Sequence, residues 1–214
     1  MDTFFNDFFS YERILLLLGV ALFLVLLTGL ILFIVRKQPI KLYYLLSFLI
    51  PVVMIAFPSI QRVTFLNDFV SFEKMVEEVA DNPEDEEARK DLRQALQGVE
   101  QRPVSDPEKL IGIAKAYLYL GDYDRAGKYI DKTLELQPGH EEAQRVQHFI
   151  QLSQAQEELQ EDPDNPAIRE KVERNVRLLE DEPKMSKAET KVLEKGKKLL
   201  PGKDSLRIDT LPPQ

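Results

Sequence analysis

Two long apolar runs open the chain. Residues 14–35 and residues 42–60 contain no charged side chain and are rich in Leu, Ile, Val and Phe. At about 1.5 Å per residue, a helix over the first run is about 33 Å long, which is enough to cross the hydrocarbon core of a bilayer. Neither run has the polar face that a helix at the surface of a soluble domain would need. The pattern therefore predicts a transmembrane helical hairpin over residues 14–60.

The leader before the first run, residues 1–13, is acidic and aromatic. A cleaved signal peptide has a basic leader and a shorter apolar stretch, so we interpret the first run as a retained span. The second run contains Pro51 and Pro58, and we expect both prolines to bend it. The leader has five aromatic side chains that we expect to lie at the membrane interface: Phe4, Phe5, Phe8, Phe9 and Tyr11.

The short loop between the runs, residues 36–41, is basic. It holds Arg36, Lys37 and Lys41, whereas the outer flanks hold only Arg13 and Arg62 as nearby basic residues. Because positive loops stay in the cytoplasm, we expect the loop inside and both chain ends outside. In a bacterium with two membranes, the chain would be an integral protein of the inner membrane with its helical domain in the periplasm.

Helical periodicity continues after the second run. Apolar residues recur every three or four positions over residues 63–80 and 84–100, and the pattern predicts about seven helices between residues 63 and 199. Asn82-Pro83 ends the first of these helices, since proline disfavours helix in the residue before it. The last segment, residues 200–214, loses this periodicity and contains three prolines and one glycine, so we expect a flexible tail.

Residues 107–138 carry the most specific pattern in the chain. They read PEKLIGIAKAYLYLGDYDRAGKYIDKTLELQP: a helix, a Gly121-Asp122-Tyr123 turn, a second helix and a closing proline. Small Ala114 and Ala126 stand where two packed helices would cross. This segment resembles the tetratricopeptide repeat (TPR) family, whose helical hairpins of about 34 residues stack into peptide-binding arrays.

Weaker copies flank this repeat. The stretch 83–103 aligns with the stretch 163–183 at a constant offset of 80, which pairs Arg89 with Arg169 and Leu92 with Val172. The predicted fold class is therefore all-α: a two-span transmembrane hairpin followed by a TPR-like α-solenoid of about seven helices over residues 63–199.

Composition excludes several functions. The net charge is −8, which disfavours nucleic-acid binding because phosphate contacts need clustered Lys and Arg. There is no cysteine, and the two histidines, His140 and His148, stand eight positions apart and do not form a metal pair. We expect His140, beside Pro138-Gly139, to be solvated. No catalytic constellation is evident, so we predict a protein without enzymatic activity, metal or cofactor.

The TPR resemblance implies a partner-binding face. In that pattern the groove-facing positions of the first repeat helix correspond to Ile111, Lys115, Leu118 and Tyr119, which would suit a protein or peptide segment. TPR modules that clamp a chaperone's C-terminal carboxylate use asparagine where this chain has Gly112, which disfavours that partner class. Alternatively, Leu118 and Tyr119 pack on a neighbouring helix and bind no partner.

Two functions follow from this pattern. In the first, the chain is a membrane-anchored scaffold or adaptor that binds a partner at the membrane surface and helps assemble a membrane complex. In the second, it is a structural accessory subunit that contacts its complex through the transmembrane hairpin, where Gly19, Ala21 and Gly29 permit close helix approach. The general plan is similar to that of the TPR subunits of bacterial cytochrome c maturation, although those proteins have a longer loop between their spans.

Overall fold

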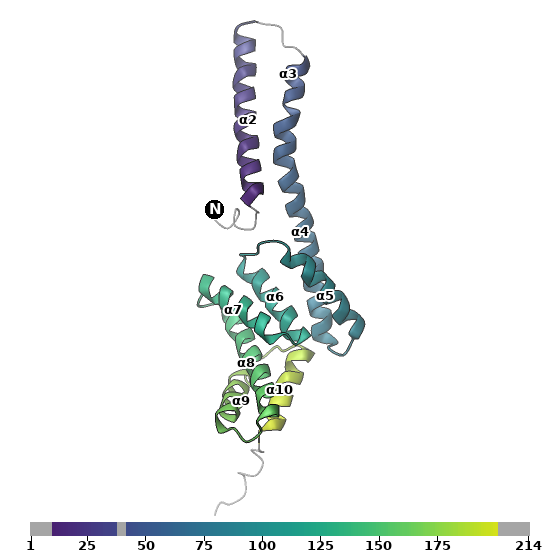
Figure 1. Cartoon of the computed structure of the whole chain (residues 1–214), viewed down its shortest axis with the longest axis vertical. Helices are drawn as coiled ribbons and strands as arrows, with labels where there is room; N and C mark the ends of the chain where they lie inside the picture. Colours follow the sequence, from purple (N-terminus) through teal and green to yellow (C-terminus); the bar gives the residue numbers. More distant parts are fainter. Residues whose placement is uncertain (1–9, 38–41, 201–214) are drawn as a thin grey trace, which may run out of the picture. The chain divides into compact units, whose positions relative to one another are not determined.

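The structure is a computed structural model that describes residues 10–37 and 42–200. Every regular element within these two ranges is an α-helix, and together they make nine helices (Figure 1). The helices are α2 (Ser10–Val35), α3 (Leu42–Ser47), α4 (Leu49–Asp81), α5 (Glu86–Glu100), α6 (Pro107–Leu120), α7 (Tyr123–Leu136), α8 (Glu141–Glu161), α9 (Pro166–Leu179) and α10 (Lys187–Leu199). The prediction of an all-α protein is confirmed.

The chain forms two compact units. The first comprises residues 1–72 and 97–106, and the second comprises residues 73–96 and 107–214. The residues of the N-terminal aromatic cluster before Ser10, the loop residue Lys41 and the tail beyond Leu200 lie outside the described residues. The predictions made for them therefore remain predictions.

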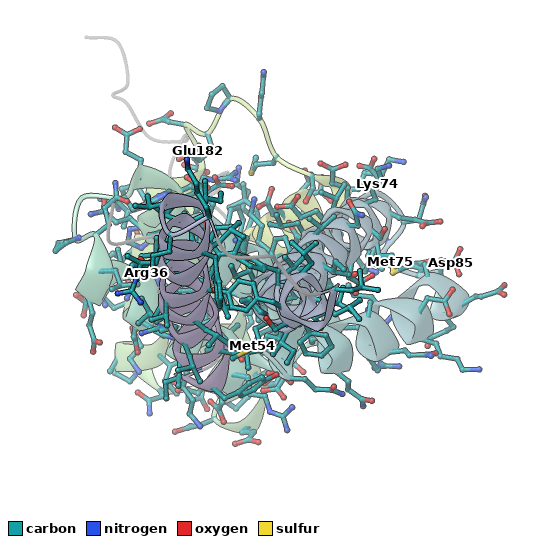
Figure 2. The ribbon with its side chains drawn as sticks, turned by 90° about the horizontal axis from the view of Figure 1, so that it is seen from above. Arg36, Met54, Lys74, Met75, Asp85 and Glu182 are labelled. Atoms are coloured by element: carbon teal, nitrogen blue, oxygen red, sulfur yellow. The ribbon has the colours of Figure 1, made fainter. Side chains whose placement is uncertain are left out.

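In the first unit, α2 lies antiparallel beside α3 and the start of α4 (Figure 1). The Tyr44 hydroxyl donates a hydrogen bond of 2.6 Å to the Leu26 carbonyl. A side chain at Gly29 would collide with that hydroxyl, and one at Gly19 would lie 3.1 Å from Cβ of Met54. Figure 2 shows Met54 on the side of α4 that faces α2. The two glycines therefore allow the close approach of the two apolar segments.

Among the described residues, one helix is long and apolar enough to cross a membrane, not two. It is Arg13–Val35, with 23 residues, and its length and composition fit a membrane anchor and a signal sequence alike. The second apolar run is interrupted at Phe48, which separates α3 from α4. Pro51 explains the break, because it has no N–H for the Ser47 carbonyl and its ring crowds that carbonyl. At Pro58 the helix continues without interruption.

An aromatic cluster of Phe65, Phe69 and Phe72 lies on α4, at the end of the stretch of this helix that belongs to the first unit. The rings of Phe65 and Phe69 lie 6.1 Å apart and those of Phe69 and Phe72 lie 5.4 Å apart. Val104 is buried in the same unit, and the Arg102 guanidinium stands 5.4 Å from the centre of the Phe65 ring. The cluster lies on one face of α4 because its members are three or four residues apart.

The second unit is built from packed helix pairs. The α6 helix packs against α7 and α8 against α9, while α8 also contacts α6, α7 and α10. The turn between α6 and α7 uses Gly121 in the left-handed region, at φ 86°, where a side chain would be strained. Asp122 then caps α7 by accepting a hydrogen bond from the Arg125 amide. The residues predicted for the helix crossing, Ala114 and Ala126, are fully buried.

The offset of 80 residues is visible in atomic detail. Arg89 at the start of α5 donates to the Pro83 carbonyl, and Arg169 at the start of α9 donates to the Pro163 carbonyl. Buried residues also correspond along the two helices: Leu92 with Val172, Leu96 with Val176, and Val99 with Leu179. The two segments therefore repeat the same local structure, including the loop that precedes each helix.

Candidate functional site

A hollow of about 220 Å³ lies within the second unit, between α6, α8, α10 and the loop before α5. We call it the α10 hollow. Its floor includes the buried side chains of Leu118, Phe149 and Gln156, and its rim includes the exposed Lys191 and Lys195 of α10. It combines an apolar floor with cationic edges, an arrangement that can bury an apolar group while the charges remain hydrated.

One wall of the hollow is Tyr119, at the end of α6. Its hydroxyl lies 3.4 Å from Oε1 of Glu189, which is only 3% exposed. Burial of the phenol and the neighbouring charge of Glu189 raise the pKa of Tyr119 well above its ordinary value. The phenol therefore stays neutral and donates to the carboxylate. The other carboxylate oxygen of Glu189 lies 3.6 Å from Nη1 of Arg145, so this buried charge is compensated.

Glu189 also holds the start of α10. Its carboxylate accepts a hydrogen bond of 2.8 Å from the Ser186 amide, and its own amide donates to the Ser186 hydroxyl at 3.2 Å. This reciprocal pair is a capping box, and it satisfies two amides that the helix leaves without partners. The carboxylate that contacts Tyr119 is therefore fixed by the end of the helix that carries it.

A second polar cluster, which shares Arg145 with the first, joins α6 to α8. Lys115 donates a hydrogen bond to Glu142, and Arg145 lies 3.8 Å from the same carboxylate. Burial opposes ionisation of Glu142, but Lys115, Arg145 and His140 outweigh it, and the pKa of this carboxyl is lowered. Lys115 is therefore engaged within the protein.

The edge of the hollow formed by the loop before α5 is held by contacts between residues that are distant in sequence. The Arg89 guanidinium donates to the carbonyls of Tyr119, at 3.1 Å, and Leu120, at 3.4 Å, which are the last carbonyls of α6. A cation suits this end of a helix, where the dipole is negative. Lys191 of α10 pairs with Glu84 at 2.8 Å. The loop before α5, the end of α6 and α10 are thereby held around one hollow.

Of the four predicted groove residues, two line the α10 hollow and two do not. Tyr119 and Leu118 line the α10 hollow, although Leu118 is only 5% exposed and belongs to the floor. Ile111 is 2% exposed and packs in the core, and Lys115 is paired with Glu142. The structure thus brings Leu118 and Tyr119 to the hollow and leaves Ile111 outside it. Their role in binding a partner remains a prediction.

We expected His140 to be solvated, but the structure shows that it is largely covered. Its side chain is 11% exposed, and its Nε2 atom lies 3.1 Å from a carboxylate oxygen of Glu108. The residue immediately precedes α8, where the chain turns back toward the start of α6. This contact between helix ends explains why a histidine after Pro138-Gly139 is covered.

Several residues of the hollow have no counterpart among the predicted site residues. They are Arg89, Phe149, Gln156, Val192, Lys191 and Lys195. The capping-box pattern of Ser186 and Glu189 was present in the sequence, but it indicates only where α10 begins. The meeting of α10 with the loop before α5 joins residues more than a hundred positions apart, and no local pattern encodes it.

A larger hollow, of about 500 Å³, lies between α8 and α9. Its polar lining is partly engaged within the protein, since Nδ1 of His148 lies 3.1 Å from Oδ1 of Asn175 and Lys171 pairs with Glu158 at 3.3 Å. It contains none of the four predicted groove residues.

No protein-family model matches this chain, and comparisons with curated proteins and with solved structures find no match either. The likeness to TPR repeats therefore rests on the residues of the chain itself.

Proposed function

We propose that this protein is a membrane-anchored helical adaptor that uses the α10 hollow to hold a segment of a partner protein, most naturally another subunit of a membrane complex. The observation that carries the proposal is the hollow itself, where Tyr119 and Leu118 of the TPR-like repeat meet α8 and α10. In TPR arrays the first helices of successive repeats line the binding face, and α6, α8 and α10 occupy those places in the sequence order here.

The size and lining of the hollow support a peptide ligand. Sites for small organic ligands usually measure about 300–1,000 Å³, whereas this hollow measures about 220 Å³. It is better suited to one or two apolar side chains of a peptide whose acidic or polar neighbours contact Lys195 and compete with Glu84 for Lys191. Tyr119 and Tyr123 add aromatic surface, which contributes strongly to protein interfaces.

The anchor in this proposal is the hairpin of α2 with α3 and the start of α4. The second segment crosses the membrane as two helices, with the break at Phe48 covered by α2: the rings of Phe23 and Phe48 lie 5.7 Å apart. Membrane helices tolerate such breaks where a neighbouring helix covers them. The bias of Arg36, Lys37 and Lys41 favours a cytoplasmic loop and a helical domain on the other side.

The topology can be tested with reporters fused to the C-terminus of the full chain. A reporter active only outside the cytoplasm should give signal, and one active only in the cytoplasm should give none. The opposite result would reverse the orientation and place the α10 hollow in the cytoplasm.

The alternative function, an accessory subunit that binds its complex through the hairpin, loses one of its supporting features. Gly19 and Gly29 are both occupied by contacts within the chain, with Met54 and Tyr44. They serve the hairpin itself and leave no glycine surface for a foreign helix on that side. Ala21 remains exposed.

Co-purification of the full chain in mild detergent tests the proposed function. We expect a partner to co-purify with the wild-type chain and to be lost from the double variant Lys191→Ala and Lys195→Ala. The matched control, Lys90→Ala and Lys128→Ala, removes two exposed lysines away from the hollow and should retain the partner. Equal recovery with both double variants would exclude the hollow and favour the hairpin as the contact.

A further inference from the structure

The helix α10 carries four exposed lysines along one face. They stand four, four and three positions apart, so at about 100° per residue they fall within about 80° of one another around the helix. We call this set the lysine stripe, and its members are Lys187, Lys191, Lys195 and Lys198. The stripe is about 16 Å long at about 1.5 Å per residue. Two of its members, Lys191 and Lys195, also lie on the rim of the α10 hollow.

The fold itself uses one member of the stripe. Lys191 pairs with Glu84 at 2.8 Å, and its hydrogen bond and charge lower the pKa of that carboxyl. Within the described ranges, no carboxylate pairs with the other three lysines, although Glu194 stands within one turn of Lys198. Like charges one turn apart destabilise a helix, and Lys187 stands at the first position of α10, where the helix dipole disfavours a cation. The stripe therefore weakens α10, and a single ion pair within the chain offsets this effect.

The stripe differs in sign from the helices around it. Residues 107–183, which contain α6 to α9, hold 17 acidic side chains and 10 lysines and arginines, whereas residues 184–200 hold six lysines and two glutamates. One of these glutamates, Glu189, is buried in its capping box. Most of the second unit therefore repels an acidic partner, and α10 attracts it. Such a charge pattern determines where a partner can bind and in which orientation.

We propose that the segment held by the α10 hollow is an acidic helix of the partner protein, which lies along α10 with its carboxylates against the lysine stripe. This inference rests on the proposed function and adds the chemistry of the partner. Acidic residues at every third or fourth position of a helix recur about every 5–6 Å along its axis, which is the interval of the lysines. Glu84 already makes this contact within the chain, and a carboxylate of the partner would replace it at Lys191.

An anionic membrane surface matches the stripe less well. Helices that lie on membranes insert large apolar or aromatic side chains beside their lysines. In α10 no large apolar side chain is exposed, since Leu193 is buried and Val192 and Leu199 are half-buried. The apolar surface next to the stripe is the floor of the α10 hollow. A protruding side chain of a protein can enter this hollow, whereas a flat bilayer surface cannot.

Charge reversal at the two stripe members that do not line the hollow tests the proposal in the full chain. In co-purification from mild detergent, Lys187→Glu with Lys198→Glu should recover about ten-fold less partner than the wild type, because two attractions become repulsions. The matched control, Lys90→Glu with Lys128→Glu, makes the same change of charge away from the hollow and should recover the partner fully. Recovery with the wild type should fall between about 0.1 M and about 0.5 M salt, since salt screens exposed charges.

The milder variant Lys187→Gln with Lys198→Gln checks that the loss does not come from misfolding. Its urea midpoint should match that of the wild type, while its recovery of the partner falls about three-fold. Recovery that does not change with salt would refute the acidic helix.

The outcomes also separate this inference from the proposed function. If Lys191→Ala with Lys195→Ala loses the partner but Lys187→Glu with Lys198→Glu retains it, the hollow holds the partner and the acidic helix is refuted. If both variants retain the partner, the proposed function fails as well. The full chain in neutral-lipid nanodiscs can also be mixed with vesicles of anionic lipid. Binding to these vesicles that is lost on charge reversal, with recovery of the partner unchanged, would assign the stripe to lipid instead.

Discussion

Gly196 determines how closely α10 can approach its neighbours, and replacing it with alanine tests this packing. A methyl group at this position would lie 2.9 Å from Cγ2 of Val176, 3.0 Å from Nε2 of Gln156 and 3.1 Å from Cδ1 of Leu152. Leu152 is fully buried, and Gln156 is held by its hydrogen bond of 2.8 Å to the Val192 carbonyl. None of the three can move without disturbing the core or the α10 hollow.

The magnitude follows from two opposing effects. Overpacking of this kind costs about 1–3 kcal/mol, whereas replacing glycine by alanine inside a helix gains about 1 kcal/mol. We therefore expect Gly196→Ala to lower the free energy of unfolding by about 1 kcal/mol, within a range of about 0–2 kcal/mol. Gly127 of α7 provides the control, because nothing lies within 4 Å of a methyl group added there. Gly127→Ala should raise the stability by about 0.5–1 kcal/mol.

Urea unfolding of the full chain in mild detergent, followed by circular dichroism, measures both variants. We expect shifts of opposite sign in the unfolding midpoint with unchanged slopes. If Gly196→Ala were as stable as Gly127→Ala, α10 would not be seated against α8 and α9, and the α10 hollow would lose one of its walls.

Three further predictions concern other parts of the molecule. Ala126→Leu at the crossing of α6 and α7 should lower the urea midpoint by an amount equivalent to about 1–3 kcal/mol, since the site is fully buried. Tyr44→Phe should destabilise the hairpin by about 0.5–1.5 kcal/mol in a detergent titration, because it removes the hydrogen bond to Leu26. The lowered pKa of Glu142 gives stability that is present above the carboxyl's unfolded pKa and is lost as the pH falls through its folded pKa. When the pH is lowered from about 5 to about 3, the free energy of unfolding should therefore fall less for Glu142→Gln than for the wild type.

The positions of the helices follow closely from local sequence. The predicted start of the second periodic helix at residue 84 differs from that of α5 by two residues, and the predicted end of the first at Ala80 differs from that of α4 by one. Gly121 and Asp122 determine their turn because only glycine adopts that backbone angle readily and the aspartate can cap the next helix. Such signals depend on neighbouring residues and can be read without a structure.

The candidate site could be predicted only in part. The repeat pattern placed Ile111 and Leu118 on a binding face, yet both are buried. Burial depends on what packs against α6, and the pairing of Lys191 with Glu84 comes from the far end of the chain. A periodic pattern shows which residues share a face, but it does not show which element covers that face.

Site-specific photo-crosslinking in cells tests the central claim most directly. A benzophenone amino acid placed at Lys195, on the rim of the α10 hollow, should attach the full chain to a partner protein that mass spectrometry can identify. The same group at Lys128, an exposed lysine of α7 away from the hollow, should give no such product. The predicted result is a crosslink from position 195 to one defined protein, and its yield falls when the same chain also carries Lys191→Ala. Absence of a product at Lys195, or equal products at Lys195 and Lys128, would contradict the assignment of the α10 hollow as the partner site.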